Sequence, residues 1–334
     1  MRKYSIALAV SLLLILAAAA LMPSPSSPEE GTTDLAHQSA EVPLRDVGAA
    51  APSTLIFTGD IMLDRGVRRV IERRGADHLF TEAVDSLFRS AQVVVGNLEC
   101  PATHIVAPQQ KRFIFRAEPE WLDVLRKHGI THLNLANNHS VDQGRRGLDD
   151  TRRRITAAGM TPIGAGASVS EACRPVLLTA SPRPVWLFAS LQLALENFAY
   201  LEHAVSVAQQ PIDSLLSQVH RWRLQHPHDV IIVSLHWGAE HQLEPTSSQR
   251  LEAHRLVDAG ADALVCHHTH TLQTVEHYRG RTIFYSLGNF IFDQPKPLNS
   301  MAAVASLKVT PDSLFVSTLP VVIDHCVPHL QPLR

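Results

Sequence analysis

Short apolar runs of strand length alternate with helix-like segments from Thr54 onward, and this alternation limits the folds open to the chain. The clearest strand candidates are the runs at 55–58, 93–96, 131–136, 185–190, 230–236 and 282–286. Apolar residues recur at helical spacing in the segments 79–89, 211–223 and 247–259. Strands that alternate with helices are typical of an α/β fold, so we predict one α/β domain here.

Several strand candidates end in a residue that can bind a metal ion. Asp60 ends the first run and His236 ends another, whereas Glu99 and His139 follow shortly after two more. Carboxylates and imidazoles are usual ligands of divalent ions, and α/β proteins place their sites at strand ends. The repetition therefore suggests a metal site assembled from several loops.

The segment 263–270 contains the densest set of such residues, an apolar run followed by His267, His268 and His270. In an extended segment, residues two apart point to the same face, so the imidazoles of His268 and His270 would project together from a strand end. Two exposed histidines at a strand end are also compatible with an ordinary surface. The other polar strand ends favour the metal site.

Asn137, Asn138 and His139 follow the run at 131–136, with Asp142 close behind. An amide oxygen can complete a metal shell, and an imidazole beside it can transfer a proton. The two asparagines also fit a simple role in a turn or a helix cap.

The N-terminus has an export pattern, in which Arg2 and Lys3 precede a nearly continuous apolar run from 6 to 22. The run is short for a membrane span, so a cleaved signal peptide (residues 1–22) and an uncleaved anchor both remain open. Residues 23–53 are rich in Pro, Ser, Ala and Glu and are expected to form a flexible linker. We therefore expect an exported, periplasmic or otherwise extracytoplasmic domain, either free or anchored to the cytoplasmic membrane by residues 6–22.

Charge and cysteine content exclude several functional classes. The formal net charge is −2, so no basic field favours a nucleic-acid partner. The adjacent Arg152, Arg153 and Arg154 are interpreted as a solvated helix face. The four cysteines form no C-x-x-C pattern, and one disulfide is possible without the sequence identifying the pair. The chain has no P-loop, nucleophile elbow or dinucleotide-binding fingerprint.

The polar motifs follow one another in a characteristic order. They are Gly59-Asp60-Ile61-Met62, Gly96-Asn97-Leu98-Glu99, Ala136-Asn137-Asn138-His139 with Asp142, His236-Trp237-Gly238-Ala239-Glu240, His268-Thr269-His270 and Gly288-Asn289-Phe290-Ile291-Phe292-Asp293. As a set, over residues 54–294, they resemble the CapA family of bacterial capsule-synthesis proteins linked to poly-γ-glutamate. Residues 295–334 are expected to add strands to the same domain.

The CapA family in turn resembles the calcineurin-like metallophosphoesterases. This resemblance implies a four-layer α/β/β/α sandwich with mixed sheets around one or two divalent ions, such as Mn, Zn, Fe or Mg. The implied metal ligands are Asp60, Glu99, Asn138, His236, His268 and His270. The implied catalytic residues are His139, as the proton donor, with Asp142 and Glu240.

The chain departs from the phosphoesterase pattern in two places. Met62 stands where the phosphoesterases have a histidine ligand, and a thioether is a poor ligand for hard or borderline ions. Cys266 and His267 replace the usual glycine-containing residues before the last histidine pair, and Thr269 stands where the family often has proline.

Two functions follow from the resemblance. In the first, the chain is a metal-dependent hydrolase or transferase that acts on an envelope polymer or its phosphorylated precursor. It would use metal-activated water on a phosphoester or a γ-glutamyl amide bond. In the second, it is a non-catalytic accessory subunit, tethered to the membrane by its N-terminus, in a complex with polymer synthase and export subunits. The polymer itself, a capsule component such as poly-γ-glutamate, is implied only by the family.

Overall fold

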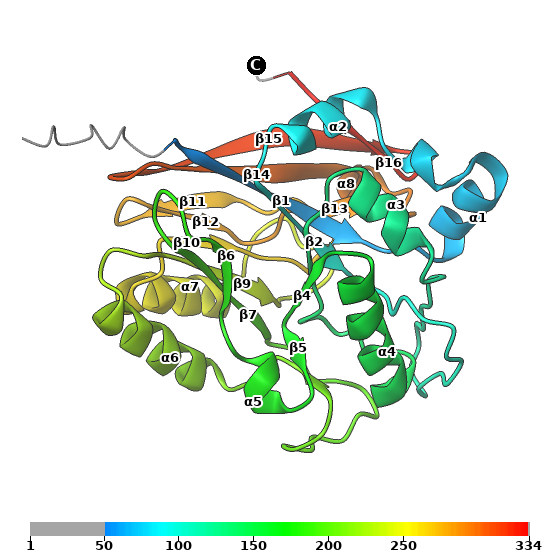
Figure 1. Cartoon of the computed structure of the whole chain (residues 1–334), viewed down its shortest axis with the longest axis horizontal. Coiled ribbons are helices and arrows are strands. Elements are labelled where there is room, and N and C mark those ends of the chain that lie inside the picture. The colour runs from blue at the N-terminus through cyan, green and yellow to red at the C-terminus, as the bar shows by residue number, and fades with distance from the viewer. Residues whose placement is uncertain (1–50, 333–334) are drawn as a thin grey trace, which may run out of the picture. The chain divides into compact units, whose positions relative to one another are not determined.

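Two mixed β-sheets pack face to face in the part of the chain that the computed structural model describes, residues 51–332 (Figure 1). Helices cover the outer face of each sheet, which gives four layers in the order α/β/β/α. The predicted four-layer sandwich with mixed sheets is therefore confirmed. The predicted signal or anchor and nearly all of the predicted linker lie outside the described residues. Within residues 51–332, no helix combines the length and the apolar character needed to cross a membrane.

The first sheet has the strand order β16-β15-β14-β1-β2-β3-β4, and β13 pairs with the end of β1. Its members are β1 (Ser53–Ile61), β2 (Val93–Leu98), β3 (His132–Asn134), β4 (Thr161–Ile163), β13 (Asn289–Ile291), β14 (Met301–Val309), β15 (Leu314–Asp324) and β16 (Val327–Leu330). Strands β1 to β4 run parallel, whereas β14, β15 and β16 form an antiparallel meander that joins the sheet beside β1.

The second sheet has the order β11-β12-β10-β9-β7-β6. Its members are β6 (Val176–Thr179), β7 (Val185–Leu191), β9 (Val230–His236), β10 (Ala263–Val265), β11 (Val275–Tyr278) and β12 (Arg281–Phe284). The four central strands are parallel and the two edge strands are antiparallel to their neighbours. Two short strands, β5 (Ala165–Gly166) and β8 (Ser206–Val207), pair separately.

Helices α1 to α4 pack on the outer face of the first sheet, and α6 and α7 pack on the outer face of the second. The long helices are α1 (Arg65–Arg74), α2 (Glu82–Arg89), α3 (Trp121–Lys127), α4 (Gly144–Ala157), α6 (Ile212–Gln225) and α7 (Ser247–Ala259). The short ones are η1 (Ala76–Leu79), α5 (Val169–Ala172) and α8 (Pro297–Ser300). Helix α7 begins with a capping box, in which Thr246 and Gln249 satisfy each other's backbone N–H groups.

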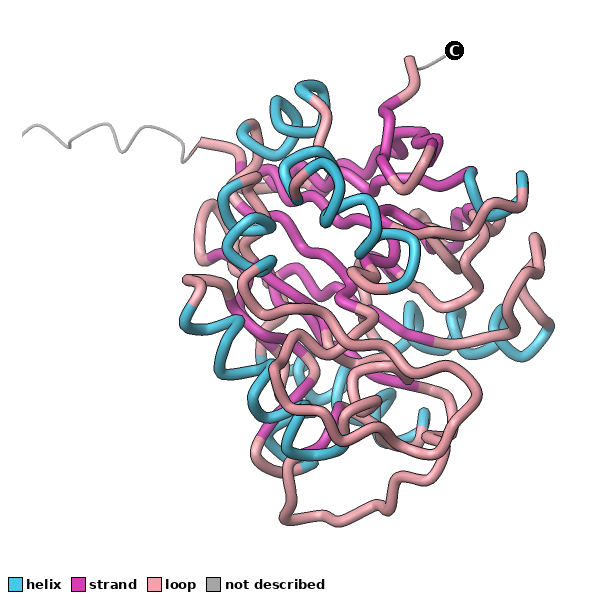
Figure 2. Tube along the Cα trace, turned by 90° about the vertical axis from the view of Figure 1, so that its right-hand side faces the viewer, coloured by secondary structure: helices cyan, strands magenta, loops and turns pink. Residues whose placement is uncertain are grey.

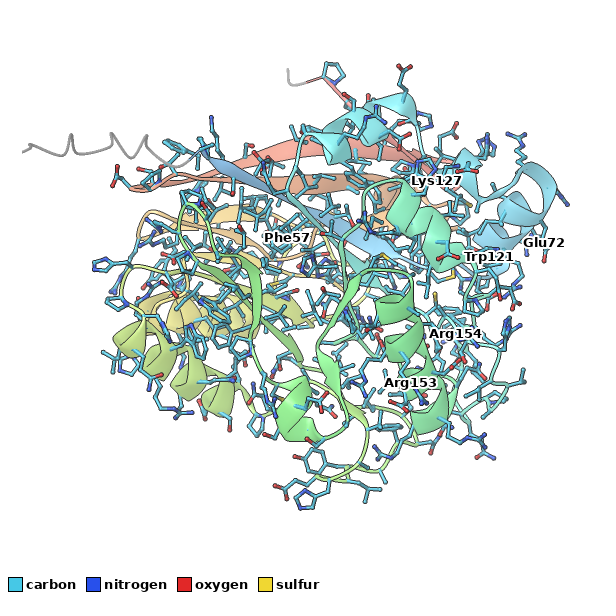
Figure 3. All side chains as sticks on the ribbon, in the orientation of Figure 1. Phe57, Glu72, Trp121, Lys127, Arg153 and Arg154 are labelled. Carbon is cyan, nitrogen blue, oxygen red and sulfur yellow. The ribbon has the colours of Figure 1, made fainter. Side chains whose placement is uncertain are left out.

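The side chains of β1 explain why the sheets form a sandwich. Leu55 and Phe57 pack between the two sheets, whereas Ile56 packs against the helices. All three are at most 1% exposed, because alternate side chains of a strand point to opposite faces and both faces are covered. Figure 3 shows Phe57 between the sheets. The apolar run that predicted this strand is the pattern of a strand buried on both sides.

Parallel strands bring the polar residues that follow them to one end of the sandwich. Asp60 pairs in register with Asn97 of β2 and with Asn289 of β13. In the second sheet, His236 at the end of β9 bridges to His267, which follows β10. Figure 2 looks towards the end at which β1 finishes, where long loops face the viewer. The fold therefore gathers residues from both sheets at this end.

Candidate metal centre

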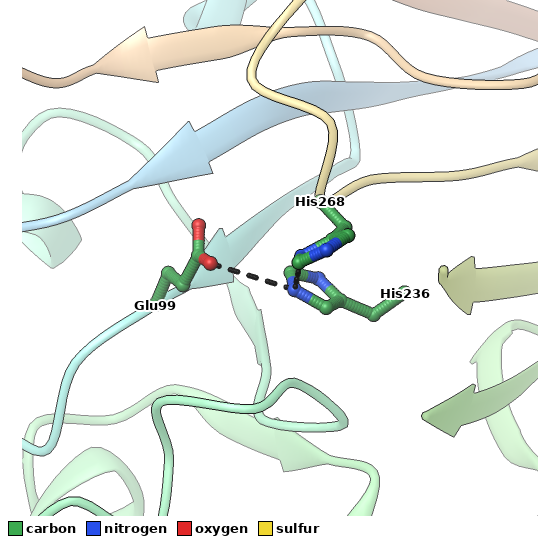
Figure 4. A group of neighbouring side chains, drawn as sticks. All are labelled: Glu99, His236 and His268. Carbon is green, nitrogen blue, oxygen red and sulfur yellow. Dashed lines mark hydrogen bonds and ion pairs between the residues drawn. The ribbon is translucent and has the colours of Figure 1, made fainter. Parts of the chain in front are cut away.

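Two overlapping clusters of carboxylate and imidazole groups lie at the carboxyl ends of the two sheets. One consists of Glu99, His236 and His268, and the other of Asp60, Glu99 and His270. In each cluster the ligand atoms lie within 4.8 Å of one another, and all five side chains are buried. Figure 4 shows the first cluster, with Glu99 after β2, His236 at the end of β9 and His268 in the loop after β10. The structure thus brings five of the six predicted ligands together through Glu99.

The distances within the clusters are those of groups that face a common point. Nε2 of His236 lies 3.4 Å from Oε1 of Glu99 and 3.2 Å from Nδ1 of His268. Nδ1 of His270 lies 3.3 Å from Oδ2 of Asp60 and 3.9 Å from Oε2 of Glu99. The two oxygens of Glu99 therefore face different clusters, which is the arrangement of a bridging carboxylate.

Three carboxylate oxygens of the clusters are buried without a hydrogen-bond partner among the described residues. They are Oδ2 of Asp60 and both side-chain oxygens of Glu99. A buried charged group without a partner is strongly unfavourable, and such groups usually pair or coordinate metals. A divalent cation would supply the missing partner, and a set of carboxylate oxygens and imidazole nitrogens suits Zn, Mn or Fe. The residues present therefore fit a bound divalent ion.

The two carboxyl groups have opposite pKa shifts. Burial, together with the nearby Asp60, raises the pKa of Glu99 well above its ordinary value. Burial acts on Asp60 in the same sense, but the close approach of His270 and the charges of His267 and His270 outweigh burial and lower the pKa of Asp60. Two adjacent carboxyl groups do not both ionise readily, so a nearby cation favours the ionised form of Glu99.

The imidazoles also differ in protonation. Burial, together with His268, lowers the pKa of His236 well below its ordinary value. Burial, together with His270, lowers the pKa of His268 to about 4. Both rings are therefore neutral near pH 7, which is the form that binds metals. Burial also acts to lower the pKa of His270, but Glu99 and Asp60 outweigh it and raise this pKa to about 9.

Asn138, the sixth predicted ligand, lies beside the first cluster. Its Oδ1 is 2.8 Å from Nε2 of His236. The amide oxygen therefore faces the same nitrogen that Glu99 and His268 face. All six predicted ligands meet in one region.

His139 and Asp142 form a buried pair next to Asn138. Nδ1 of His139 lies 2.8 Å from Oδ2 of Asp142, and its ring packs 4.3 Å from the ring of Phe115. Burial lowers the pKa of His139, although Asp142 acts in the opposite direction. Because Asp142 holds Nδ1, the other ring nitrogen, Nε2, is left for a reacting group.

Lys111 completes this network, and no sequence pattern indicates its role. Its Nζ donates to Oδ1 of Asp142 at 2.7 Å and to the backbone carbonyl of Asn138 at 3.0 Å. The side chain of Lys111 is 4% exposed and that of Asp142 is fully buried. A lysine that returns to the site from a long irregular loop is recognisable only in three dimensions.

Glu240 is the predicted site residue that lies outside both clusters. Its side chain is 43% exposed on the loop after β9, and it approaches His241 at 3.8 Å. Its charge still adds to the burial that raises the pKa of Glu99, and it opposes the burial that lowers the pKa of His268. The structure thus places Glu240 near the rim of the site.

The extended conformation predicted for the segment 263–270 is wrong beyond Val265. Strand β10 ends at Val265, and His268 and His270 have positive φ angles of 102° and 56°. Such angles cost a non-glycine residue about 1 to 3 kcal/mol and persist where the surroundings enforce them, often at functional sites. The two imidazoles therefore reach the site through a tight turn, and not through the alternation of a strand.

The residues that depart from the phosphoesterase pattern have structural contacts. Met62 is buried in the core beneath the helices, and its sulfur accepts a hydrogen bond from the backbone N–H of Asp64. Nε2 of His267 donates to the carbonyl oxygen of Thr58 at 3.0 Å, which ties the loop after β10 to β1. Cys266 is buried, and all four cysteines are free thiols.

Two asparagines contact the predicted ligands. Asn97 donates to Oδ1 of Asp60 at 2.8 Å and so orients that carboxylate. Outer contacts such as that of Asn97 orient metal ligands and fix their protonation. Oδ1 of Asn289 lies 3.0 Å from Nδ1 of His270, the nitrogen that also faces Asp60 and Glu99, so a cation bound by that nitrogen would replace this contact. Both asparagines belong to the strand-end motifs of the sequence, and this position is the sequence feature that could have indicated their role.

Comparison with known proteins finds relatives of this chain. Residues 54–294 match the family described as Bacterial capsule synthesis protein PGA_cap. The chain is 34% identical over 241 residues to the PGA biosynthesis protein CapA of Bacillus subtilis, which covers 71% of this chain and 63% of that protein. It is 32% identical over 255 residues to the capsule biosynthesis protein CapA of Bacillus anthracis. That alignment covers 72% of this chain and 60% of the relative. The chain thus spans less than two thirds of the length of these two relatives.

More distant similarities extend the comparison. A probable polyglutamine synthesis accessory protein of Mycobacterium tuberculosis is 28% identical over 289 residues, covering 72% of this chain and 74% of that protein. Among solved structures, a hypothetical protein from Thermus thermophilus aligns with 80% of this chain and 99% of its own, with a TM-score of 0.48 and 13% identity. The family match extends from β1 to just beyond β13 and includes every residue of both clusters. The chain therefore belongs to the bacterial capsule synthesis protein family PGA_cap.

Proposed function

We propose that this chain is a metal-dependent hydrolase of capsule or polyglutamate biosynthesis. The observation that carries the proposal is the position of Glu99, whose two unpartnered oxygens face two groups of buried ligands. The buried pair of His139 and Asp142 lies next to the ligand Asn138. A metal site with only a structural role has no need of such a proton-transfer pair beside it.

The residues that would hold the ions fall into two sets that share Glu99: Asp60 and His270 on one side, and His236, His268 and Asn138 on the other. A bound divalent ion would lower the pKa of a water molecule and polarise a phosphoryl or carbonyl oxygen of the substrate. Met62 adds no ligand to the side of Asp60, because its sulfur is engaged with a backbone N–H. One ion therefore has more protein ligands than the other.

His139 would protonate the leaving group. Asp142 holds Nδ1 of the ring, so Nε2 can donate to the leaving oxygen or nitrogen. Asp142 also stabilises the protonated ring against the effect of burial. Lys111 pairs with the other oxygen of Asp142 and so compensates the buried charge of that carboxylate.

The substrate of this proposed activity is an envelope polymer or its precursor. Two relatives are named for PGA or capsule biosynthesis, and a third for polyglutamine synthesis. The bond cleaved would be a phosphoester or a γ-glutamyl amide. The N-terminal sequence pattern supports an extracytoplasmic location, with residues 6–22 either removed with the signal or kept as the membrane anchor.

A non-catalytic accessory subunit of a polymer synthesis and export complex is the second candidate. Two observations favour this accessory role. Met62 stands where a metal ligand would be expected, and the M. tuberculosis relative is named as an accessory protein. In this role the metal would stabilise the fold, and His139 would have no chemical task.

Metal analysis combined with kinetics on the full chain tests the proposal. We expect the purified protein to contain Mn, Zn or Fe and to hydrolyse p-nitrophenyl phosphate or a γ-glutamyl anilide. Glu99→Gln should lose the metal, whereas His139→Asn should keep the metal and lose about 10²- to 10⁴-fold in activity. Glu72→Gln, at an exposed position on α1, is the matched control and should change neither.

Two outcomes would reject the hydrolase. One is a protein that takes up none of these metals during expression with each of them. The other is a metal-loaded protein that is inert towards both substrates. If, in addition, cells with His139→Asn produce normal amounts of polymer, the accessory role is favoured.

A further inference from the structure

A groove with an excess of positive charge lies between α1 and the turn that joins β15 to β16. It has a volume of about 610 Å³, and α1 lines one side with Arg69, Arg73 and Arg74, here called the groove arginines. The opposite side contains Asp324 and His325. Asp324 is the only carboxylate in the lining, and it already pairs with His325 at 2.7 Å.

The groove arginines form no ion pair with a carboxylate anywhere in residues 51–332, and Arg74 instead approaches the ring of His78 at 3.0 Å. By contrast, Arg65 and Arg68 of the same helix both pair with carboxylates. The helix dipole favours basic residues in the last turn of α1, but this does not explain Arg69, which lies earlier in the helix. The positive charge of the groove is therefore left without a partner in the described structure.

The three adjacent arginines of α4 provide a comparison within the chain. Each of Arg152, Arg153 and Arg154 lies within 3.1 Å of a carboxylate on α4 or α5. Figure 3 shows Arg153 and Arg154 on α4 and Glu72 on α1. Glu72 is the only acidic residue of α1. The two triplets have the same formal charge, but only the triplet on α4 is neutralised locally.

A second cavity, of about 540 Å³, continues the groove. It shares Gly66, Arg69, Asp324 and His325 with the first cavity and reaches Phe292 and Asp293. The ring of Phe292 packs 4.7 Å from the ring of His270. The two cavities thus lead from α1 to residues that border the candidate metal centre. The positive charge is concentrated at the α1 end, because Asp293 and Asp324 line the second cavity and Arg69 is the one arginine of its described lining.

We propose that this groove binds a stretch of an acidic polypeptide, whose carboxylates pair with the groove arginines. The identity of that polypeptide as the polymer of this pathway rests on the proposed function, whereas the charge of the groove does not. Among the residues that the structure describes, no exposed large apolar side chain lines the groove, so a membrane would find no hydrophobic anchor in that lining. The lining phenylalanines, Phe80 and Phe292, are 9% and 2% exposed and offer no surface on which nucleobases stack.

Binding of fluorescein-labelled poly-γ-glutamate to the full chain, measured by fluorescence anisotropy, tests the groove. We expect binding that weakens as salt increases. The variant R69Q/R73Q/R74Q should bind about tenfold or more weakly, because three ion pairs are lost. The variant R152Q/R153Q/R154Q removes the same charge from α4 and should change affinity by less than about twofold.

Four results would overturn the proposal. The first three are no polymer binding by the unmodified chain, equal losses of affinity in both triple variants, and no loss of affinity in either. The fourth is groove-dependent binding of single-stranded DNA or of anionic phosphatidylserine vesicles that is as tight as binding of the polymer. Glu99→Gln separates this proposal from the hydrolase. In this background, which has lost the metal, the changes R69Q/R73Q/R74Q should still weaken polymer binding about tenfold. If the protein bound no metal, the effect of the groove arginines on polymer binding could still be measured. If the groove arginines had no effect, the metal content and the hydrolase activity could still be measured.

Discussion

His270 is protonated near neutral pH when no cation is present, and Glu99 holds a proton more readily than an ordinary carboxyl group. Burial, with Asp60, raises the pKa of Glu99, and the carboxylates outweigh burial to raise the pKa of His270 to about 9. His236 and His268 are already neutral near pH 7, because burial lowers their pKa values. An incoming ion therefore competes with a proton at His270 and favours the ionised form of Glu99.

We expect the affinity for Zn or Mn to increase between about pH 6 and about pH 9 and each binding event to release protons. His270 is protonated below its pKa of about 9, so at lower pH the ion must displace that proton and binds more weakly. Isothermal titration calorimetry in two buffers of different ionisation enthalpy measures the release. An affinity that does not change with pH, without proton release, would contradict this account.

The buried pair of Lys111 and Asp142 is expected to make a large contribution to stability. Lys111→Met leaves the Asp142 carboxylate buried with one partner fewer, and breaking a buried pair in this way typically costs about 3 to 5 kcal/mol. Urea unfolding of the metal-free protein measures the free energy of unfolding. Lys127→Met is the matched control. The side chains of Lys127 and its partner Asp77 are 64% and 58% exposed, so this substitution should lower the free energy of unfolding by less than about 1 kcal/mol. Equal costs for the two variants would show that the Lys111 pair has no special role.

Among the secondary structure elements, the close contact of β1 with β13 determines where Asp60 lies. A Cβ atom on Gly59 would lie 2.2 Å from the carbonyl oxygen of Gly288 and 2.9 Å from that of Asn289. Both obstacles are backbone atoms of the segment that enters β13, so a side chain at position 59 fits only if the two strands separate. Gly59 thus allows the approach that places Asn289 in register with Asp60.

Gly59→Ala is expected to lower the melting temperature and to reduce metal binding, because separation of β1 from β13 displaces Asp60 from His270. Thermal unfolding and metal analysis of the purified variant measure both effects. Gly280→Ala is the control, since nothing lies within 4 Å of a Cβ there and only its positive φ of 74° is strained. That strain costs about 1 kcal/mol and leaves the metal centre intact. A Gly59→Ala protein with full metal content would show that the contact is not needed for the site.

For the domain as a whole, the family match ends before the fold does. The match stops at residue 294, yet β14 is the direct neighbour of β1 in the first sheet. Ala303, Ala305 and Leu307 of β14 belong to the core between the two sheets. The meander of β14, β15 and β16 is therefore part of the same folded unit.

A chain that ends after Gln294 is expected to aggregate and to lack a cooperative unfolding transition. Without β14, β1 would become an edge strand with unpaired backbone groups next to an open core. Size-exclusion chromatography and thermal unfolding test this. A chain that ends after Leu330, where β16 finishes, should behave like the full chain. A monomeric, cooperatively folded chain of residues 1–294 would refute the prediction.

Strand prediction succeeded where a strand is long and covered on both faces. β1, β2, β7 and β9 are recognisable as continuous apolar runs, because buried parallel strands are apolar on both sides. β10 has three residues, and the turn after it depends on contacts with β1, so the local pattern wrongly extended it. Lys111 was missed because its partners are 27 and 31 positions away and no local pattern connects them.

The sequence by itself determined the α/β class and the residue types at the strand ends, because burial and backbone periodicity act between near neighbours in the chain. Only the tertiary structure decided that Glu99 faces two clusters, that His268 and His270 reach them through a tight turn, and that the groove arginines lack carboxylate partners within residues 51–332. These features depend on which strands pair and how closely loops approach, and such long-range contacts leave no period in the sequence.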